Sequence, residues 1–150
     1  MRIYSGEESA KLVGDLVSEK HQVKPRSIEL TVAAVYQPEK AGEIDFGGSE
    51  QKKADSKPLE PEKRSEDDKY GWWNLTEGEY FVEFNETVKV PEGSISFLRP
   101  LPRTLEGGGI QPSLIYMEGE EITRVPLSVG KTGFNIKENA RISSATFLEI

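Results

Sequence analysis

From residue 27 to its end, the chain is a succession of short segments rich in β-branched and aromatic residues, divided by turns that contain Gly or Pro. SIELTVAAVYQ (27–37) stops at a proline, and GEYFVEFNETVKV alternates apolar and polar residues before PEG (91–93) turns it into SISFLR. SLIYM, ITRVPLSVG, GFNIKENARIS and ATFLEI follow as four more expected strands. This alternation is typical of antiparallel strands. It predicts a mainly β fold, a sandwich or barrel with one helix packed outside.

The expected helix covers residues 5–19. Ser5 and Glu8 are spaced as a capping box. Apolar residues follow at helical spacing, namely Leu12, Val13, Leu16 and Val17. His21 is the only histidine and falls at the end of this helix, where it can bind terminal carbonyls or favour the helix dipole. A single histidine without further partners forms neither a His-based metal cluster nor a catalytic triad.

One segment lacks the residues needed for a core. Residues 49–69 (SEQKKADSKPLEPEKRSEDDK) hold one large apolar side chain among dense mixed charge. We expect an exposed, mobile loop inside a single domain of residues 1–150, because the parts on either side are each too small to fold alone. Trp72 and Trp73 follow directly. They are expected to cover a barrel end or fill a subunit interface, with ligand stacking as the alternative.

Charge and composition exclude several classes of function. The formal charge is −7 and the pI is near 4.9, so neither a nucleic-acid backbone nor an anionic membrane surface is an expected partner. The absence of cysteine excludes disulfides, thiol catalysis and Cys-based metal centres. With no apolar leader and no run long enough to span a bilayer, the expected location is the cytoplasm.

Local motifs alone assign no chemistry. GKT (130–132) has the ending of a P-loop, but Val125 stands where the required glycine would be, and a hairpin turn is expected instead. Acidic clusters could hold a hard cation, and the cluster of Glu118, Glu120 and Glu121 is the one beside a Gly-rich segment. That segment, EGGGI (106–110), could aim backbone N–H groups at an anion or could simply form a turn.

Four separated stretches, taken in order, resemble the dUTPase / dCTP deaminase superfamily, particularly its archaeal members. They are VKPRSIELTVAAVY after the opening helix, GEYFVEFNETVKVPEGSISFLRP, GGGIQPSLIYMEGEE, and FNIKENARISSATF with its Arg–Ile pair. The likeness covers most of the chain apart from the charged loop. It implies a distorted antiparallel barrel or jelly roll of the β-clip type, assembled as a homotrimer with nucleotide sites between subunits. It also implies either Mg²⁺-dependent dUTP hydrolysis or zinc-free deamination of dCTP.

The phosphate motif of the superfamily, Pro–Arg–Ser–Ser–x–x–Arg–x–Gly, is only partly matched. Anchored on Gly108, the motif keeps its Pro and Gly, but Glu106 falls on its second arginine. A shift of two residues recovers one arginine and one hydroxyl, as Arg103 and Thr104. The resemblance thus makes Arg103, Thr104 and Gly108 the candidate phosphate-binding residues.

The base-binding hairpin is matched less well. Tyr116 and Gly119 fall on an aromatic and a glycine position of the superfamily. Met117 falls on the catalytic Asp of a dUTPase, Glu120 on the aromatic that stacks on the base, and Leu127 on the general base of a deaminase. Neither a thioether nor an alkyl group can take a proton, and loss of a general base costs about 10²–10⁴-fold in rate.

These assignments leave three functional hypotheses. The leading one is a family protein of dUTP and dCTP metabolism whose catalytic motifs are degraded, and which is therefore a nucleotide-binding or non-catalytic homologue. The alternative is an active dUTP diphosphatase or dCTP deaminase with a remodelled site, in which Glu118 or Glu120 is the base. In that case Glu29, at the position of an early Asp, would hold hydrated Mg²⁺. The third is a structural or partner-binding β-clip module.

Overall fold

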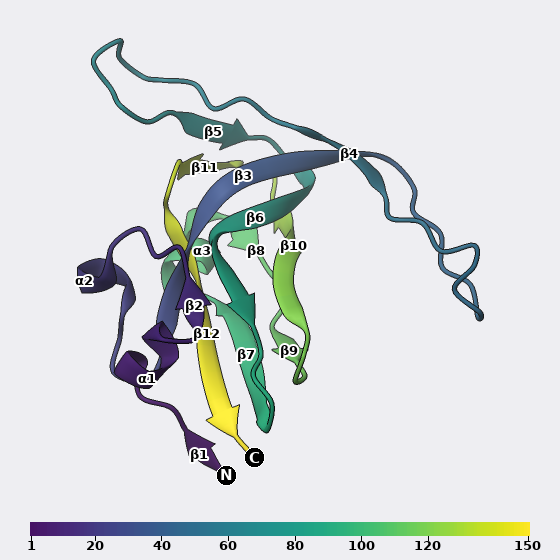
Figure 1. Cartoon of the computed structure of the whole chain (residues 1–150). Coiled ribbons are helices and arrows are strands. Elements are labelled where there is room, and N and C mark those ends of the chain that lie inside the picture. The colour runs from purple at the N-terminus through teal and green to yellow at the C-terminus, as the bar shows by residue number, and fades with distance from the viewer.

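The computed structural model describes all 150 residues, and its main feature is one curled antiparallel sheet (Figure 1). Its helices are α1 (Gly6–Ala10), α2 (Glu19–Gln22) and α3 (Pro102–Gly107). Its strands are β1 (Arg2–Ile3), β2 (Val13–Gly14), β3 (Ile28–Lys40), β4 (Asp55–Pro58), β5 (Trp72–Leu75), β6 (Gly78–Lys89), β7 (Ser94–Pro100), β8 (Gly109–Ile110), β9 (Leu114–Tyr116), β10 (Glu121–Val129), β11 (Phe134–Lys137) and β12 (Arg141–Glu149). The mainly β, barrel-like prediction is confirmed.

The sheet runs in the order β8-β10-β6-β3-β12-β7-β9, with β1, β2 and β4 pairing at its margins, and β11-β5 forms a separate pair. Curling brings apolar side chains of the long strands to the inside. Leu30, Val82, Leu98, Leu127 and Phe147 are among the fully buried side chains there. β9 ends this order on one side, and β10 is next to last on the other, beside the two-residue β8, so the turn that joins β9 and β10 bridges the two margins of the sheet.

The N-terminal helix begins as predicted but is much shorter. Ser5 accepts from the Glu8 amide and the Glu8 carboxylate accepts from the Ser5 amide, which completes the capping box. These bonds and the Arg2 guanidinium lower the pKa of Glu8. The expectation of a helix through residue 19 is wrong. Val13 instead pairs with Val88 of β6, and Asp15 takes a left-handed φ of 63° that ends any helical path.

The charged segment 49–69 is largely exposed. It is not a loop throughout, because it contains β4, which pairs with the outer part of β3. Two extended arms leave the body around this pairing, residues 41–54 and residues 59–71 (Figure 1). The first, which we call the 41–54 arm, is closed by a single bridge between Glu43 and Lys52.

The two tryptophans have different environments. Trp73 is buried in the core, and its indole N–H donates to the Leu59 carbonyl at 2.8 Å. Trp72 is partly exposed, with the Arg64 guanidinium 3.5 Å above its ring. Packing therefore accounts for Trp73, as expected. The GKT segment forms the turn between β10 and β11, closed by the Gly133 amide on the Gly130 carbonyl. The turn is confirmed but the hairpin is not, because β10 pairs with β6 and β8 whereas β11 pairs with β5.

Candidate functional site

A group of arginines surrounds a buried carboxylate on the outer face of the sheet. Glu29 of β3 is only 6% exposed. It accepts from Arg141 of β12 at 2.9 Å and from Arg103 of α3 at 3.3 Å. Arg141 also donates to the His21 carbonyl at 2.8 Å. One buried negative charge thus holds two guanidinium groups in fixed positions, and both keep further N–H donors for another anion.

Strand register adds a third arginine to this face. Ser144 of β12 pairs with Glu29 on one side and with Arg99 of β7 on the other. Directly paired residues point to the same face of a sheet, and neighbouring strands lie about 4.8 Å apart. Arg99 therefore stands roughly 10 Å from Glu29. We call Arg99, Arg103 and Arg141 the arginine cluster.

The residues predicted to bind phosphate beside Arg103 have structural partners. The Thr104 hydroxyl is buried and donates to the Ile142 carbonyl at 2.6 Å. Gly108 ends α3 with a left-handed φ of 113°. A Cβ on either neighbouring glycine, at 107 or 109, would lie within 2.6 Å of the Phe134 ring. Close packing and the end of a helix therefore explain the Gly triplet. This agrees with the alternative in which EGGGI forms a turn.

The predicted hairpin residues gather at a different place. Gly119 has a φ of 83° and its amide donates to the Val90 carbonyl. The Glu118 carboxylate accepts from the Gly93 amide at 2.7 Å, and that of Glu120 from the Met117 amide at 2.8 Å. Both carboxylates are exposed and support the turn through backbone bonds.

The two strands of this hairpin do not pair with each other. Residues 114–116 (β9) pair with β7, whereas residues 121–129 (β10) pair with β6, and β8 covers only Ser128 and Val129 on the second edge of β10. Each strand thus has an edge of backbone N–H and C=O groups with no strand beside it. We call the space between these edges the seam. Unpaired backbone groups at a seam can read the edge of a planar polar ligand.

Tyr116 lies at this seam, half-buried against the core. Burial and, to a smaller extent, the Glu120 carboxylate raise the pKa of its phenol above the ordinary value of 10.0. The neutral phenol is therefore the form that a ligand would meet at neutral pH.

This perturbation gives a pH prediction. Below pH 10.0, Tyr116 is protonated in both the folded and the unfolded chain, so it does not make the free energy of unfolding depend on pH. Above that value the unfolded chain loses its phenolic proton first. The free energy of unfolding is therefore expected to fall as the pH rises from 10.0 through the raised pKa of Tyr116 in the folded chain. In an ultraviolet tyrosinate titration, Tyr116→Phe should remove a component at the alkaline end, and Glu120→Gln should shift that component downward. Removal of a component with an ordinary midpoint would contradict this reading.

One chain does not bring the arginine cluster and the hairpin turn together. Glu118 contacts Gly93, just before β7 begins, while Arg99 lies at the far end of β7. Six residues at about 3.3 Å each separate the two by roughly 20 Å. Sequence reasoning placed Arg103 and Glu29 but omitted Arg99 and Arg141 from the site. The Arg–Ile pair at Arg141 in the closing strands was the available signal.

The donor set does not fit a protein-held Mg²⁺ ion. No group of three potential metal-ligating side chains occurs. The carboxylate of Glu29 faces two guanidinium groups, which already neutralise it and would repel a cation.

Similar proteins of known family identify the family of this chain. No family model matches the chain. It is 33% identical over 138 residues to a probable deoxyuridine 5'-triphosphate nucleotidohydrolase of Methanosarcina mazei, covering 91% of this chain and 77% of the relative. The chain belongs to the dUTPase / dCTP deaminase superfamily. A Methanosarcina acetivorans protein of the same name is 32% identical over the same length.

The fold of the superfamily is found as well. The 2'-deoxycytidine 5'-triphosphate deaminase of Agrobacterium tumefaciens superimposes with a TM-score of 0.68 over 97% of this chain, at 14% identity. This chain spans 46% of that deaminase chain. α3 includes Arg103 and Thr104, and the seam includes Tyr116, the residues for which the sequence resemblance predicts phosphate and base contacts. Finally, no helix is both long and apolar enough to cross a membrane.

Proposed function

We propose that this superfamily member binds a deoxyribonucleoside triphosphate of the dUTP or dCTP type and that its catalytic step is impaired. The observation that carries the binding proposal is the arginine cluster, with Arg103 and Arg141 held by the buried Glu29. Guanidinium groups fixed in this way suit phosphate oxygens, because charge-assisted bonds form without further ordering of the side chains. The seam beside Tyr116 offers backbone donors and acceptors to a base.

The proposed site takes its two halves from different copies of the chain. The hairpin turn lies roughly 20 Å from the arginine cluster along β7, so a nucleotide that reaches this turn contacts the arginine cluster of one copy and the hairpin of the next. Such head-to-tail use of two surfaces closes into a ring, and a homotrimer is the assembly proposed here.

The proposal of impaired catalysis rests on the absence of a placed base. Met117 is exposed and carries no basic group. Leu127 is fully buried in the core, where it could reach no substrate. The carboxylates of Glu118 and Glu120 accept backbone amides of the turn. Glu106, on α3 beside the arginine cluster, adds a charge that repels a triphosphate.

Turnover and binding together test this proposal. Purified protein is incubated with dUTP, dCTP, dTTP or UTP, with Mg²⁺ or with a chelator, and products are separated by ion exchange. We expect no product, but a rise in Tm with dUTP or dCTP that persists without metal. A ligand at 100 times its Kd adds about 2.7 kcal/mol, which corresponds to roughly 5–10 °C for a domain of this size.

The other outcomes favour the other candidates. dUMP with pyrophosphate, or deamination of dCTP, would establish an active enzyme, and Glu118→Gln and Glu120→Gln would then identify its base. That candidate is supported by the exposure of both glutamates at the turn, where each carboxylate uses only one oxygen to accept a backbone amide. Absence of both product and Tm shift would leave a structural or partner-binding module.

A further inference from the structure

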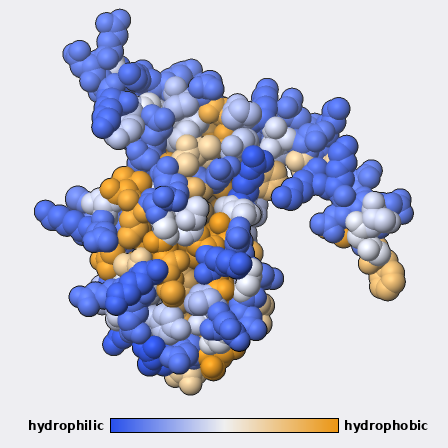
Figure 2. Space-filling view, viewed as in Figure 1, coloured by the Kyte–Doolittle hydropathy of each residue, from blue (hydrophilic) through white to orange (hydrophobic).

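The tip of the 41–54 arm exposes large apolar side chains to solvent. Ile44 is 91% exposed and Phe46 is fully exposed. Figure 2 shows apolar colour at the far end of this arm, well away from the body. Scattered apolar residues are normal on a protein surface, but two neighbouring ones at the end of a projecting ribbon form a candidate contact surface. Three carboxylates accompany them within residues 41–50, Glu43, Asp45 and Glu50, without any Lys or Arg.

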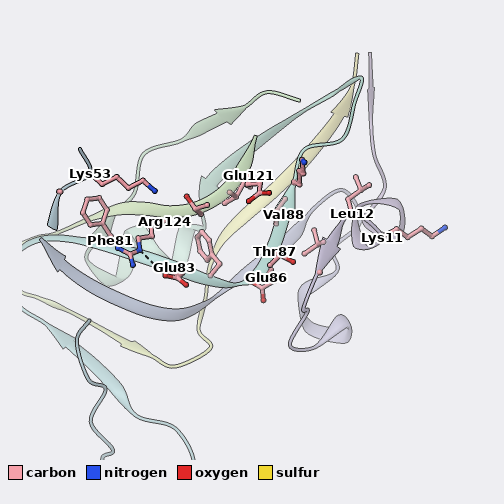
Figure 3. A pocket seen from close by; sticks show the side chains of 17 residues that line it. Lys11, Leu12, Lys53, Phe81, Glu83, Glu86, Thr87, Val88, Glu121 and Arg124 are labelled. Carbon is pink, nitrogen blue, oxygen red and sulfur yellow. Dashed lines mark hydrogen bonds and ion pairs between the residues drawn. The ribbon is translucent and has the colours of Figure 1, made fainter. Parts of the chain in front are cut away.

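The body has a groove of opposite character. It has a volume of about 1050 Å³, at the upper end of small-molecule sites, and lies between the segment after α1, the base of the arm, β6 and β10. Val88 and Ile122 form part of an apolar floor with Phe81 and Phe84. The basic residues around it are Lys11, Lys53, Lys89 and Arg124. Figure 3 shows Lys53 and Arg124 toward one end and Lys11 at the other.

The lysines of this groove are free to meet an acidic partner. Arg124 pairs with Glu83 at 3.4 Å and stacks on the Tyr36 ring, so its charge is used within the chain. None of the three lysines takes part in an ion pair. Of the remaining acids in the groove, Glu86 is buried and hydrogen-bonded, which leaves Glu121 opposite Lys89. With four basic and three acidic residues, the groove lining carries one more cation than carboxylate, in a chain of net charge −7.

We propose that the tip of the 41–54 arm docks in the groove of a second copy of this chain. Ile44 and Phe46 would cover the apolar floor, while the acidic residues of the tip meet the lysines around the groove. The arm of one chain points away from its own groove, because the β3–β4 pairing directs the ribbon outward from the base at Lys53 (Figure 1). Tip and groove are different surfaces, so the contact is head-to-tail and can close into a ring.

The natural absence of cysteine allows a direct test by cross-linking. Two singly substituted proteins of different size, Phe46→Cys and Lys89→Cys, are mixed and oxidised. The yield of the mixed disulfide between Phe46→Cys and Lys89→Cys is expected to exceed the yield of either self-linked product. Lys131→Cys, another exposed lysine position on the turn after β10, replaces Lys89→Cys in the control and should give little mixed product. Equal yields from both pairs would overturn the proposal.

Two further tests measure the mass of the assembly, one after removal of the apolar tip side chains and one after exchange of a lysine and a glutamate across the contact. In sedimentation velocity, Ile44→Ser with Phe46→Ser should weaken self-association about tenfold or more. Lys89→Glu should weaken it as well, and adding Glu43→Lys should restore part of the loss. An unchanged mass for every variant would overturn the proposal. So would a Phe46→Cys/Lys89→Cys double variant that links only within one chain at low concentration. Because no readout involves a nucleotide, the cross-link yields test the contact between arm and groove separately from the proposed nucleotide site.

Discussion

Replacing Glu86 with alanine is expected to lower the free energy of unfolding by about 3–5 kcal/mol. The Glu86 side chain is 3% exposed and accepts three hydrogen bonds. The Thr31 amide donates at 2.7 Å, the Thr31 hydroxyl at 2.5 Å and the Gln22 amide nitrogen at 2.9 Å. Alanine would leave these buried donors without an acceptor, and each unsatisfied group costs about 1–3 kcal/mol.

The same strand provides the control. Glu83 is also a carboxylate of β6, but its side chain is 44% exposed and meets only Arg124, at 3.4 Å. Glu83→Ala should therefore cost about 1 kcal/mol or less. Urea denaturation of the two variants measures the difference. Similar losses from both would show that the buried network around Glu86 adds nothing beyond an ordinary surface pair. Glu86→Gln, which keeps one acceptor oxygen, is expected to fall between the two.

Replacing Arg103 with glutamine is expected to weaken nucleotide binding about 10–100-fold, on the proposal that the arginine cluster binds phosphate. A hydrogen bond to a charged group contributes about 1.5–3 kcal/mol, which is the source of this range. Stability should change little, because the Arg103 side chain is 51% exposed and Glu29 keeps its shorter bond to Arg141. Isothermal titration with dUTP and with dCTP measures the affinity.

Arg2 is the matched control for Arg103. Its side chain is 53% exposed and forms ion pairs with Glu8 and Glu149, at the termini and outside the arginine cluster. Arg2→Gln removes the same charge from the chain, so it reproduces any effect of net charge alone. It should leave nucleotide affinity unchanged. An equal loss of affinity in both variants would assign the effect to overall charge and would remove Arg103 from the proposed site.

Features of the fold that depend on residues close together in the sequence could be predicted. Alternation identified β3, β6 and β7, and the spacing of Ser5 and Glu8 located the start of α1. The extent of the helix was mispredicted because Leu12 and Val13 suit a helix and a strand equally well. Only the pairing of Val13 with Val88, a contact across 75 residues, decides between them.

In the candidate site too, local sequence patterns could be recognised, whereas contacts between distant segments could not. Arg103 could be found because it stands inside a recognisable motif. Arg141 had a signal in the Arg–Ile pair of the closing strands, whereas Arg99 joins the cluster only through the register of β7 and β12, which no local pattern reveals. Likewise Thr104 matched the motif, yet its hydroxyl is occupied by the Ile142 carbonyl, a partner 38 positions away. The groove and its relation to the arm also depend on segments that are distant in sequence.

The seam also has a consequence for solubility. An unpaired strand edge can recruit a strand from another molecule and start aggregation, yet a seam that binds a ligand cannot be closed by a permanent strand. This chain limits the hazard in ways known from natural sheets. Its exposed strand β9 is only three residues long, Pro112 precedes it, and Pro126 interrupts the N–H groups of β10. The acidic turn between the strands adds charge repulsion. The margin at which we propose that a ligand binds is thereby a poor template for fibrils.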